Sequence, residues 1–295
     1  MSDNNNKLGL KFKAIRKQRK ISLSQLADIA GSIASISDFE NGKSHISTDV
    51  LMQLLGVLMV DPSEFFEFNF QYLDTDSSSI YSKIQQTAER GDIEAFQFYS
   101  DLTEEEYRNK GIYTYHILSI ELKLLHQMHN KIKIYNETEK NEIFDYLFSL
   151  DVWTTFDISL FGNLVDLFST NNIGLLTDEI IKSINMPPVN GHDRIIIDTL
   201  INAQLVLIKQ RAKDASSQLM KKLRSIPLSE HFLIEKIGLK FAEICYNYVF
   251  IHPDEKDYKE AAQLFNFMEI YISKSYSKAV QNEFYSIVSS ATTVK

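Results

Sequence analysis

Apolar residues recur along most of this chain three and four positions apart, which is the period of an amphipathic α-helix. The clearest short case is the segment 22–30, whose apolar positions are Leu23, Leu26, Ala27 and Ile29. Gly31 then provides a chain reversal before a second predicted helix over 32–41. The pattern therefore predicts two short helices joined by a glycine turn.

Local chemistry marks the ends of these two helices. Ser22 and Ser24 can each cap the first helix, and Ser32 is placed to cap the second. Asn41 and Gly42 end the second helix, because both residue types tolerate the backbone conformation of a helix C-terminus. Two short helices with a glycine in the turn are typical of the DNA-binding helix-turn-helix, whose second helix enters the major groove.

Further helices flank this pair. The pattern predicts a first helix over Leu8–Lys20, a fourth over Asp49–Met59 and a short fifth helix that Asp61 caps. We therefore predict a five-helix helix-turn-helix domain in residues 1–70. The polar residues 71–79 show no apolar periodicity and are predicted to form a linker.

Every convincing pattern in residues 80–295 is helical, so the predicted fold class is all-α. A capping box is expected where Thr103 is followed by Glu106. Steps of 34 to 46 residues separate candidate helix-pair starts near Ser77, Gly111, Val152, Gly191, Ser229 and Ser275. That spacing is typical of a tetratricopeptide-like superhelix of helical hairpins, although no consensus repeat is legible and a bundle of unrelated pairs is the alternative.

Charge is distributed unevenly along the chain. The net charge is −8, yet the first 68 residues contain eight Lys and Arg against eight Asp and Glu. The remaining residues therefore carry the whole negative charge. Within the first part, Lys11–Lys20 holds six cations and no anion. We expect phosphate contact at this end only, with a merely solvated helix face as the alternative.

Composition excludes several classes of protein. A hydrophobic content of 44% with 10 Gly and 5 Pro favours long helices in an ordinary soluble protein. The single cysteine, Cys245, excludes an internal disulfide and lies beside large apolar residues, so a core position is expected. Neither an apolar signal-peptide region nor an 18-residue apolar run is present. We expect a cytoplasmic location and no membrane partner.

The sequence LADIAGSIASISDFENGK resembles the helix-turn-helix of the Cro and phage-repressor type, with its Ile-Ser-x-Phe-Glu-x-Gly core at Ile36–Gly42. Residues 50–66 resemble the closing helices of that fold. The resemblance implies a domain of some sixty residues that reads double-stranded DNA. A helical hairpin without any role in nucleic-acid binding is the alternative.

A second segment, Leu147–Ser169, resembles the Rgg/GadR/MutR family of regulators, above all at Trp153, Phe156, Asp157 and Leu160–Asn163. The resemblance covers essentially the full length. It implies a cytoplasmic, dimeric transcription regulator of a low-GC Gram-positive bacterium. It further implies that a short imported peptide pheromone binds the concave face of the repeat domain and gates DNA binding, as in quorum sensing.

Candidate DNA contacts follow from the predicted exposed faces. On the second helix of the motif, Asp38 departs from the family, where an arginine often precedes Phe-Glu, so the usual base contact is in doubt there. Ser and Ala side chains read bases weakly, and specificity is expected to draw on DNA shape. The expected exposed face of that helix is Ser32, Ala34, Ser35 and Asp38, with Ile33 ambiguous between core and groove. Expected readers or phosphate clamps are Ser24, Gln25 and Ser35. Expected backbone contacts are Lys13, Arg16, Lys17 and Lys43, whereas Glu40 is expected to brace the fold.

Candidate peptide contacts are polar amides within apolar helical runs. Asn163 and Asn202 have this setting, and an amide can pair with both the donor and the acceptor of an extended peptide. An asparagine that ties two helices together is an equally good interpretation. Asp198 and Lys209 fall on roughly the same helical face as Asn202, and Asp166 is near Asn163. Trp153 is interpreted as a core residue.

No catalytic or metal motif is legible. His126 and His129 have a metal-compatible spacing but no third ligand nearby, so neither a metal nor a cofactor is expected. The chain also lacks a phosphate loop and a nucleophile elbow. Our interpretation is a homodimeric regulator on an inverted-repeat operator, not an enzyme. The alternatives are a helical scaffold whose small domain binds protein and, more remotely, a catalytic repeat domain.

Overall fold

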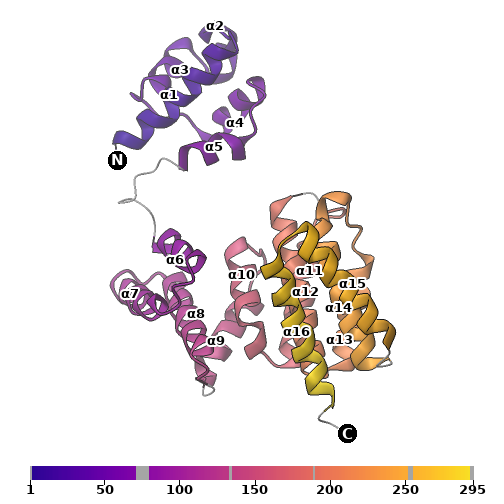
Figure 1. Cartoon of the computed structure of the whole chain (residues 1–295). Coiled ribbons are helices and arrows are strands. Elements are labelled where there is room, and N and C mark those ends of the chain that lie inside the picture. The colour runs from indigo at the N-terminus through magenta and orange to yellow at the C-terminus, as the bar shows by residue number, and fades with distance from the viewer. Residues whose placement is uncertain (1, 71–79, 133–134, 189, 252–254, 293–295) are drawn as a thin grey trace. The chain divides into compact units, whose positions relative to one another are not determined.

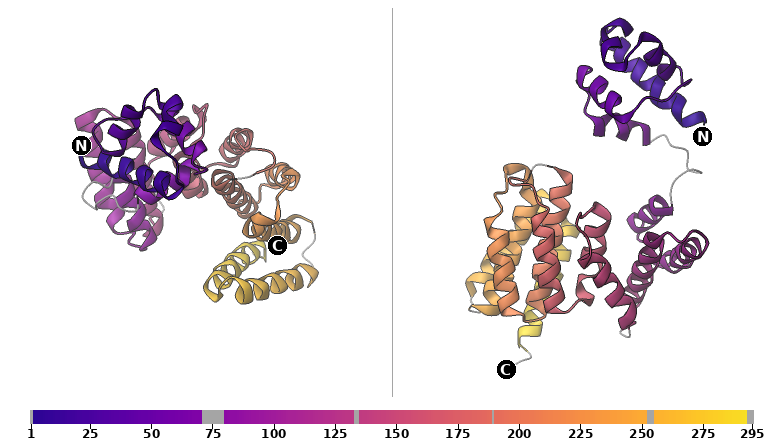
Figure 2. Two further views of the ribbon diagram at one scale, coloured as in Figure 1. Left: turned by 90° about the horizontal axis from the view of Figure 1, so that it is seen from above. Right: turned by 180° about the vertical axis from the view of Figure 1, so that it is seen from behind.

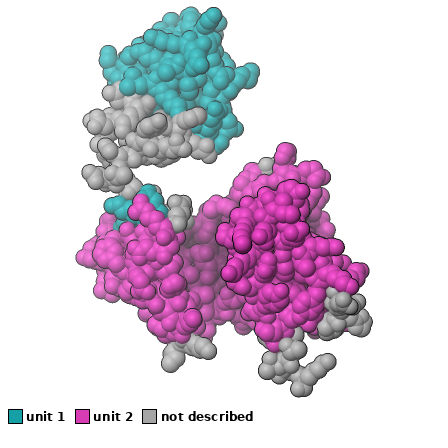
Figure 3. Space-filling model, in the orientation of Figure 1, with its two compact units in different colours: residues 1–86 teal, residues 87–295 magenta. Residues whose placement is uncertain are grey.

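The computed structural model describes residues 2–70, 80–132, 135–188, 190–251 and 255–292. All of the regular structure in these ranges is helical, which confirms the predicted all-α class (Figure 1). The chain forms two compact units, Met1–Gln86 and Thr87–Lys295 (Figure 3). The predicted linker 71–79 lies outside the described residues, and the units divide within α6 (Ile80–Glu89).

The first unit contains the five expected helices and a core of its own. These are α1 (Ser2–Gln18), α2 (Leu23–Ala30), α3 (Ile33–Glu40), α4 (Thr48–Val57) and α5 (Pro62–Phe70). Every helix contributes at least one buried apolar side chain: Phe12, Leu26, Ile36, Leu54 and Phe65 are all fully buried. The predicted start of α1 is wrong, because the helix begins six residues before Leu8.

Two glycines make the helix-turn-helix possible. Gly31 has φ +78°, in the left-handed region that suits glycine, and this conformation turns the chain from α2 into α3. Gly9 allows α1 to lie directly against α3, because a Cβ atom at Gly9 would stand 1.9 Å from the carbonyl oxygen of Phe39. The apolar periodicity of α1 gave no sign of this close approach.

The second unit is a stack of helix pairs. Its helices are α7 (Ala95–Lys110), α8 (Tyr113–His129), α9 (Glu137–Phe148), α10 (Thr155–Leu164), α11 (Thr170–Lys182), α12 (Gly191–Lys209), α13 (Lys213–Ser225), α14 (Leu233–Phe250), α15 (Glu255–Tyr271) and α16 (Lys274–Thr292). Short 3₁₀ turns, η2 (Val165–Leu167) and η3 (Glu230–Phe232), lie between some of them.

These helices form two layers. Along one layer α8 contacts α10, α10 contacts α12, α12 contacts α14 and α14 contacts α16. In the other layer α9 contacts α11 and α11 contacts α13 (Figure 2). The expected superhelix of helical hairpins is therefore present. We refer to the face that α12, α14 and α16 share as the inner face.

Most of the expected local features are present, with one error. Trp153 and Cys245 are buried in the core of this unit, and burial raises the pKa of the Cys245 thiol. The expected capping box at Thr103 is wrong, because Thr103 lies inside α7 and its hydroxyl donates to the carbonyl oxygen of Tyr99 at 2.8 Å. Glu106 instead pairs with Lys110 on the same helix.

Within the described ranges, the helices are too short or too polar for any of them to cross a lipid bilayer. Nor do three or more His, Cys, Asp or Glu side chains gather there in a way that would hold a metal ion.

Candidate functional site

The start of α2 is fixed by the capping chemistry that its sequence predicts. The backbone N–H of Gln25 donates to Ser22 Oγ at 3.3 Å, and the N–H of Ser22 donates to Gln25 Oε1 at 2.8 Å. Ser24 lies beside this capping box, with its hydroxyl 2.9 Å from that of Ser22. The exposed Ser24 and Gln25 are therefore held in place at the first turn of α2.

The first turn of α3 presents a small, exposed surface. Ser32 caps the helix by accepting a hydrogen bond from the N–H of Ser35 at 3.0 Å, and the two hydroxyls lie 2.9 Å apart. Ile33, Ala34 and Ser35 are exposed, and Ile33 keeps 49% of its surface accessible. This resolves the ambiguity of Ile33 in favour of the surface, so an apolar group is available to meet a thymine methyl.

Asp38 lies further along α3 and is half-buried. Its backbone carbonyl accepts hydrogen bonds from the N–H groups of Lys43 and Ser44, at 2.8 and 3.3 Å. These bonds order the loop that carries the exposed Lys43 side chain directly after α3.

Arg16 corrects one expectation. It was expected to contact phosphate, but only 6% of it is exposed and its guanidinium is engaged inside the unit. Nε and Nη2 donate to the Glu40 carboxylate at 2.5 and 2.8 Å, and Nη1 donates to the carbonyl oxygen of Ile21 at 2.6 Å. The hydrogen bond to Glu40 raises the pKa of Arg16. Arg16 therefore braces α1 against α3, and Glu40 has the bracing role expected of it.

The other cations near the motif remain at the surface. Lys17 and Lys43 are exposed, and Lys13 is half-buried with its ammonium donating to Asn41 Oδ1 at 2.7 Å. Arg19 and Lys20 were not singled out individually, yet both are exposed at the end of α1. Their position in the cationic run was the available signal.

A second candidate site is an open groove on the inner face of the repeat unit, with a volume of about 440 Å³. Helix α12 contributes Asp198 and Asn202, and α16 contributes Tyr276 and Glu283. Apolar side chains from α12, α14, α15 and α16 form the rest of the lining. They include Ile201, Leu205, Ile234, Phe241, Met268 and Val280.

The carboxylates around this groove differ in how they are paired. Glu283 forms an ion pair with Lys209 at 2.7 Å. Glu235, buried behind the groove, accepts from Arg194 Nη1 at 2.6 Å through one oxygen, and no described group bonds its other oxygen. Asp198 has neither a hydrogen bond nor an ion pair from any residue that the structure describes. Burial, together with the negative charge of Glu235, raises the pKa of Asp198 to about 6, although the positive charge of Arg194 opposes this shift.

The predicted peptide contacts separate into two groups. Asp198 and Asn202 line the groove, whereas Asn163, Asp166 and Lys209 are absent from its lining. Asp166 is exposed on η2, and Lys209 reaches the groove only through its ion pair with Glu283. Sequence reasoning missed Tyr276 and Glu283, because α16 is distant in sequence and carries no polar amide of the kind sought.

Both asparagines also tie helices together. The Asn202 amide donates to the carbonyl oxygen of Gly162 on α10 at 3.2 Å, and the Asn163 amide donates to Glu121 Oε1 on α8 at 2.9 Å. Glu121 is buried, and burial raises its pKa to about 7 although the hydrogen bond from Asn163 opposes this. The structural interpretation of Asn163 is therefore the better supported one.

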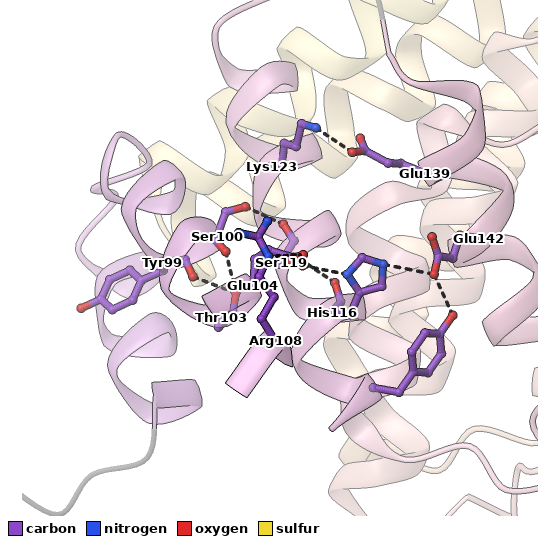
Figure 4. A network of polar contacts seen from close by, with 11 residues as sticks. Tyr99, Ser100, Thr103, Glu104, Arg108, His116, Ser119, Lys123, Glu139 and Glu142 are labelled. Atoms are coloured by element: carbon purple, nitrogen blue, oxygen red, sulfur yellow. Dashed lines mark hydrogen bonds and ion pairs between the residues drawn. The ribbon is translucent and has the colours of Figure 1, made fainter. Parts of the chain in front are cut away.

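A polar pocket of about 330 Å³ between α7, α8 and α9 is chemically different (Figure 4). The two ring nitrogens of His116 lie 2.8 Å from Glu104 and 3.2 Å from Glu142. Lys123 pairs with Glu139 at 2.6 Å. Burial alone would raise the pKa of Glu104, but hydrogen bonds from His116 and Ser119 hold it below its ordinary value. Because these charges are satisfied internally, the network joins helices and leaves little charge for a ligand.

Two family models match the chain. A family model for the C-terminal domain of the helix-turn-helix-type transcriptional regulator Rgg matches residues 97–282. The chain belongs to the Rgg family. A general helix-turn-helix model matches residues 12–65, so the Rgg assignment and the motif described above agree along the sequence. Rgg-family proteins are transcriptional regulators, and the expected resemblance is confirmed.

Solved structures share the fold of this Rgg-family chain over nearly its whole length. The SHP pheromone receptor Rgg2 of Streptococcus dysgalactiae is 21% identical, with a TM-score of 0.74 over 94% of this chain and 98% of the receptor. PrgX, in its complex with cCF10, is 16% identical, with a TM-score of 0.70 over 96% of this chain and 93% of PrgX. At these identities the likeness establishes the fold.

Proposed function

We propose that this Rgg-family regulator reads operator DNA with the first turn of α3. The observation that carries the proposal is the exposed surface of that turn, which the Ser32 cap holds in place in a unit that also carries the exposed cations Lys17 and Lys43. A capped, exposed helix start presents short side chains at the depth of a major groove, and cations nearby bind phosphates. The proposed contacts are Lys13, Lys17, Ser24, Gln25, Ser32, Ala34, Ser35, Asp38 and Lys43.

The protein is proposed to bind DNA as a homodimer on an inverted repeat, with no membrane partner and a cytoplasmic location. A dimer places two recognition helices about one DNA turn apart, which matches the two-fold symmetry of such an operator. The test is selection of bound duplexes from a random pool by the full chain, with the mass of the complex measured by sedimentation equilibrium. Half-sites about one turn apart and two chains per duplex support the proposal. If no sequence is enriched, the helix-turn-helix does not read DNA unaided; the selection is then repeated with peptide, and failure there as well indicates a protein partner for the small unit.

We further propose that a short peptide in the inner groove controls DNA binding. The groove combines apolar side chains with the amide of Asn202 and the carboxylate of Asp198. The solved relatives include a pheromone receptor and a bacterial peptide pheromone/receptor complex, which supports a peptide as the ligand class. We propose binding without chemical conversion of the ligand, because the family to which the chain belongs is one of transcriptional regulators.

A peptide controls this protein if it binds one arrangement of the dimer better than another. Calorimetric titration of the full chain with short synthetic peptides, in the presence and absence of the selected duplex, tests the coupling. The proposal predicts that the duplex changes the peptide affinity, because coupling between two binding sites is reciprocal. Equal peptide affinity with and without duplex would contradict control by the peptide.

A further inference from the structure

The charges around the inner groove do not balance. Three carboxylates belong to the groove or lie directly behind it, at Asp198, Glu235 and Glu283. The two cations that pair with them are Arg194 and Lys209. The carboxylate left over is Asp198, which is exposed, whereas only 1% of Glu235 is exposed. The groove therefore carries excess negative charge at Asp198.

A second observation points in the same direction. Glu235 is buried, yet one of its carboxylate oxygens has no hydrogen-bond partner among the described residues. Its charge reaches two groove residues, because it helps to raise the pKa values of both Asp198 and Tyr276. A buried and incompletely bonded carboxylate adds negative potential at the position where Asp198 faces a ligand, and it makes a cation there more favourable.

The rest of the groove is apolar. Ile201 and Leu205 follow Asp198 along α12, and Phe241 and Val280 come from the neighbouring helices. Such a lining favours ligand side chains that are themselves apolar, because burial of apolar surface drives association. A wholly apolar or acidic ligand would leave Asp198 desolvated without a partner, which costs binding free energy.

We propose that the groove selects peptides that combine apolar side chains with one positively charged group, and that this group pairs with Asp198. The proposal rests on the proposed function, because it assumes that a peptide occupies the groove. Two sources of the charge have the same chemistry here, a free peptide amino terminus and a Lys or Arg side chain. Glu235 acts behind Asp198 by its charge and does not itself contact the ligand.

The test is a positional-scanning library of synthetic heptapeptides with free amino termini, incubated with the full chain. Peptides that stay bound through gel filtration are identified by mass spectrometry. The proposal predicts that the retained peptides are apolar with one cationic position. Asp198→Asn should weaken the best such peptide about tenfold by calorimetry, which corresponds to the loss of one partly exposed charge pair. Asp151→Asn, an exposed carboxylate outside the groove, is the matched control and should change nothing.

Analogues of the best peptide identify the source of the charge. If acetylation of the amino terminus removes the difference between the wild type and Asp198→Asn, the terminal ammonium pairs with Asp198. If replacement of the basic residue by norleucine removes that difference, the side chain does. Either result supports the proposal, whereas a difference that survives both changes overturns it.

Other outcomes distinguish a failure of charge selection from a failure of peptide binding itself. Retained peptides that are neutral or acidic, with equal affinity for the wild type and Asp198→Asn, overturn charge selection and leave peptide binding intact. If no peptide is retained at all, both charge selection and peptide binding are contradicted. Unchanged thermal unfolding of Asp198→Asn relative to Asp151→Asn, or a small stabilisation, shows that the variant is folded, so a loss of binding is then due to the missing charge.

Discussion

Arg16 and Lys17 are neighbours in the same cationic run, but their environments are opposite. Arg16 is buried and bonded to Glu40 and Ile21, whereas Lys17 is exposed. The helical period explains the difference, because Arg16 lies four residues after the buried Phe12 and so falls on the apolar face of α1. A cation on the apolar face of a helix is stable there only with a buried partner.

Arg16→Ala should lower the free energy of unfolding of the first unit by about 3 kcal/mol, because it leaves the Glu40 carboxylate buried without its partner. Lys17→Ala, its matched control at an exposed position, should change it by less than about 0.5 kcal/mol. Hydrogen exchange of the full chain, followed for the α1–α3 amides, measures both. Equal protection of these amides in the two variants would show that the buried pair does not stabilise the unit.

We expect Glu121 to make the stability of the repeat unit sensitive to pH. Its pKa is raised to about 7 from 4.5, so the stability linked to its protonation is complete below pH 4.5 and is lost as the pH rises through about 7. Glu121→Gln keeps an oxygen for Asn163 and should therefore stabilise the unit at pH 8, by on the order of 2 kcal/mol. At pH 4.5 the substitution should have little effect.

Differential scanning calorimetry of the full chain at the two pH values tests this expectation, with Glu105→Gln on the exposed face of α7 as the control. The expected signature is a rise in the unfolding temperature for Glu121→Gln at pH 8 alone. An equal rise at both pH values would mean that the titration of Glu121 is not linked to folding.

Among the elements, the contact between α1 and α3 depends on the absence of a side chain at Gly9. The carbonyl oxygen of Phe39 occupies the position where a Cβ of residue 9 would lie. Arg16 and Glu40 join the same two helices further along. The C-terminal end of α3 is thus fixed to α1 through Phe39 and Glu40.

Gly9→Ala should destabilise the first unit by about 2 kcal/mol or more, since backbone atoms on either side must move apart. Gly56→Ala in α4 is the matched control, because that glycine is helical and exposed, and a Cβ atom there would meet nothing within 4 Å. The control should stabilise the unit by about 0.5 to 1 kcal/mol through helix propensity. Thermal unfolding of the two full-length variants measures the difference, and a shift of the same sign in both would contradict the close approach.

The sequence was sufficient wherever a feature depends on neighbouring residues. The Ser22 cap, the Gly31 turn and the spacing of the helix pairs are local, and the structure has all of them. Features that depend on distant residues were not accessible in this way. The burial of Arg16 depends on Glu40, which lies on another helix. The absence of a partner for Asp198 became evident only with α14 and α16 in place around it. Thr103 shows the same limit, because a capping motif inside a buried helix face is indistinguishable from a cap without the tertiary structure.

In the molecule as a whole, the net charge and the hydrophobic cores both divide between the two units. The first 68 residues are neutral overall and contain the cationic run, whereas the remainder carries the net charge of −8. Each unit has its own hydrophobic core, one around Phe12 and Phe65 and the other from Ile117 to Val288. An acidic repeat unit repels DNA, so we expect phosphate contacts in the small unit alone. The proposed peptide would then act from the other unit.

We infer that the exposed first turn of α3 reads DNA bases while exposed cations of the same unit contact the DNA backbone. The most direct measurement compares the affinities of wild type, Ser35→Ala and Lys17→Ala for a selected duplex and a scrambled one over a series of salt concentrations. Ser35→Ala should reduce the ratio of the two affinities and leave the salt dependence unchanged. Lys17→Ala should weaken both duplexes alike and lower the salt slope by about one. If Ser35→Ala leaves the ratio between the duplexes unchanged, the reading surface is not on this turn of α3.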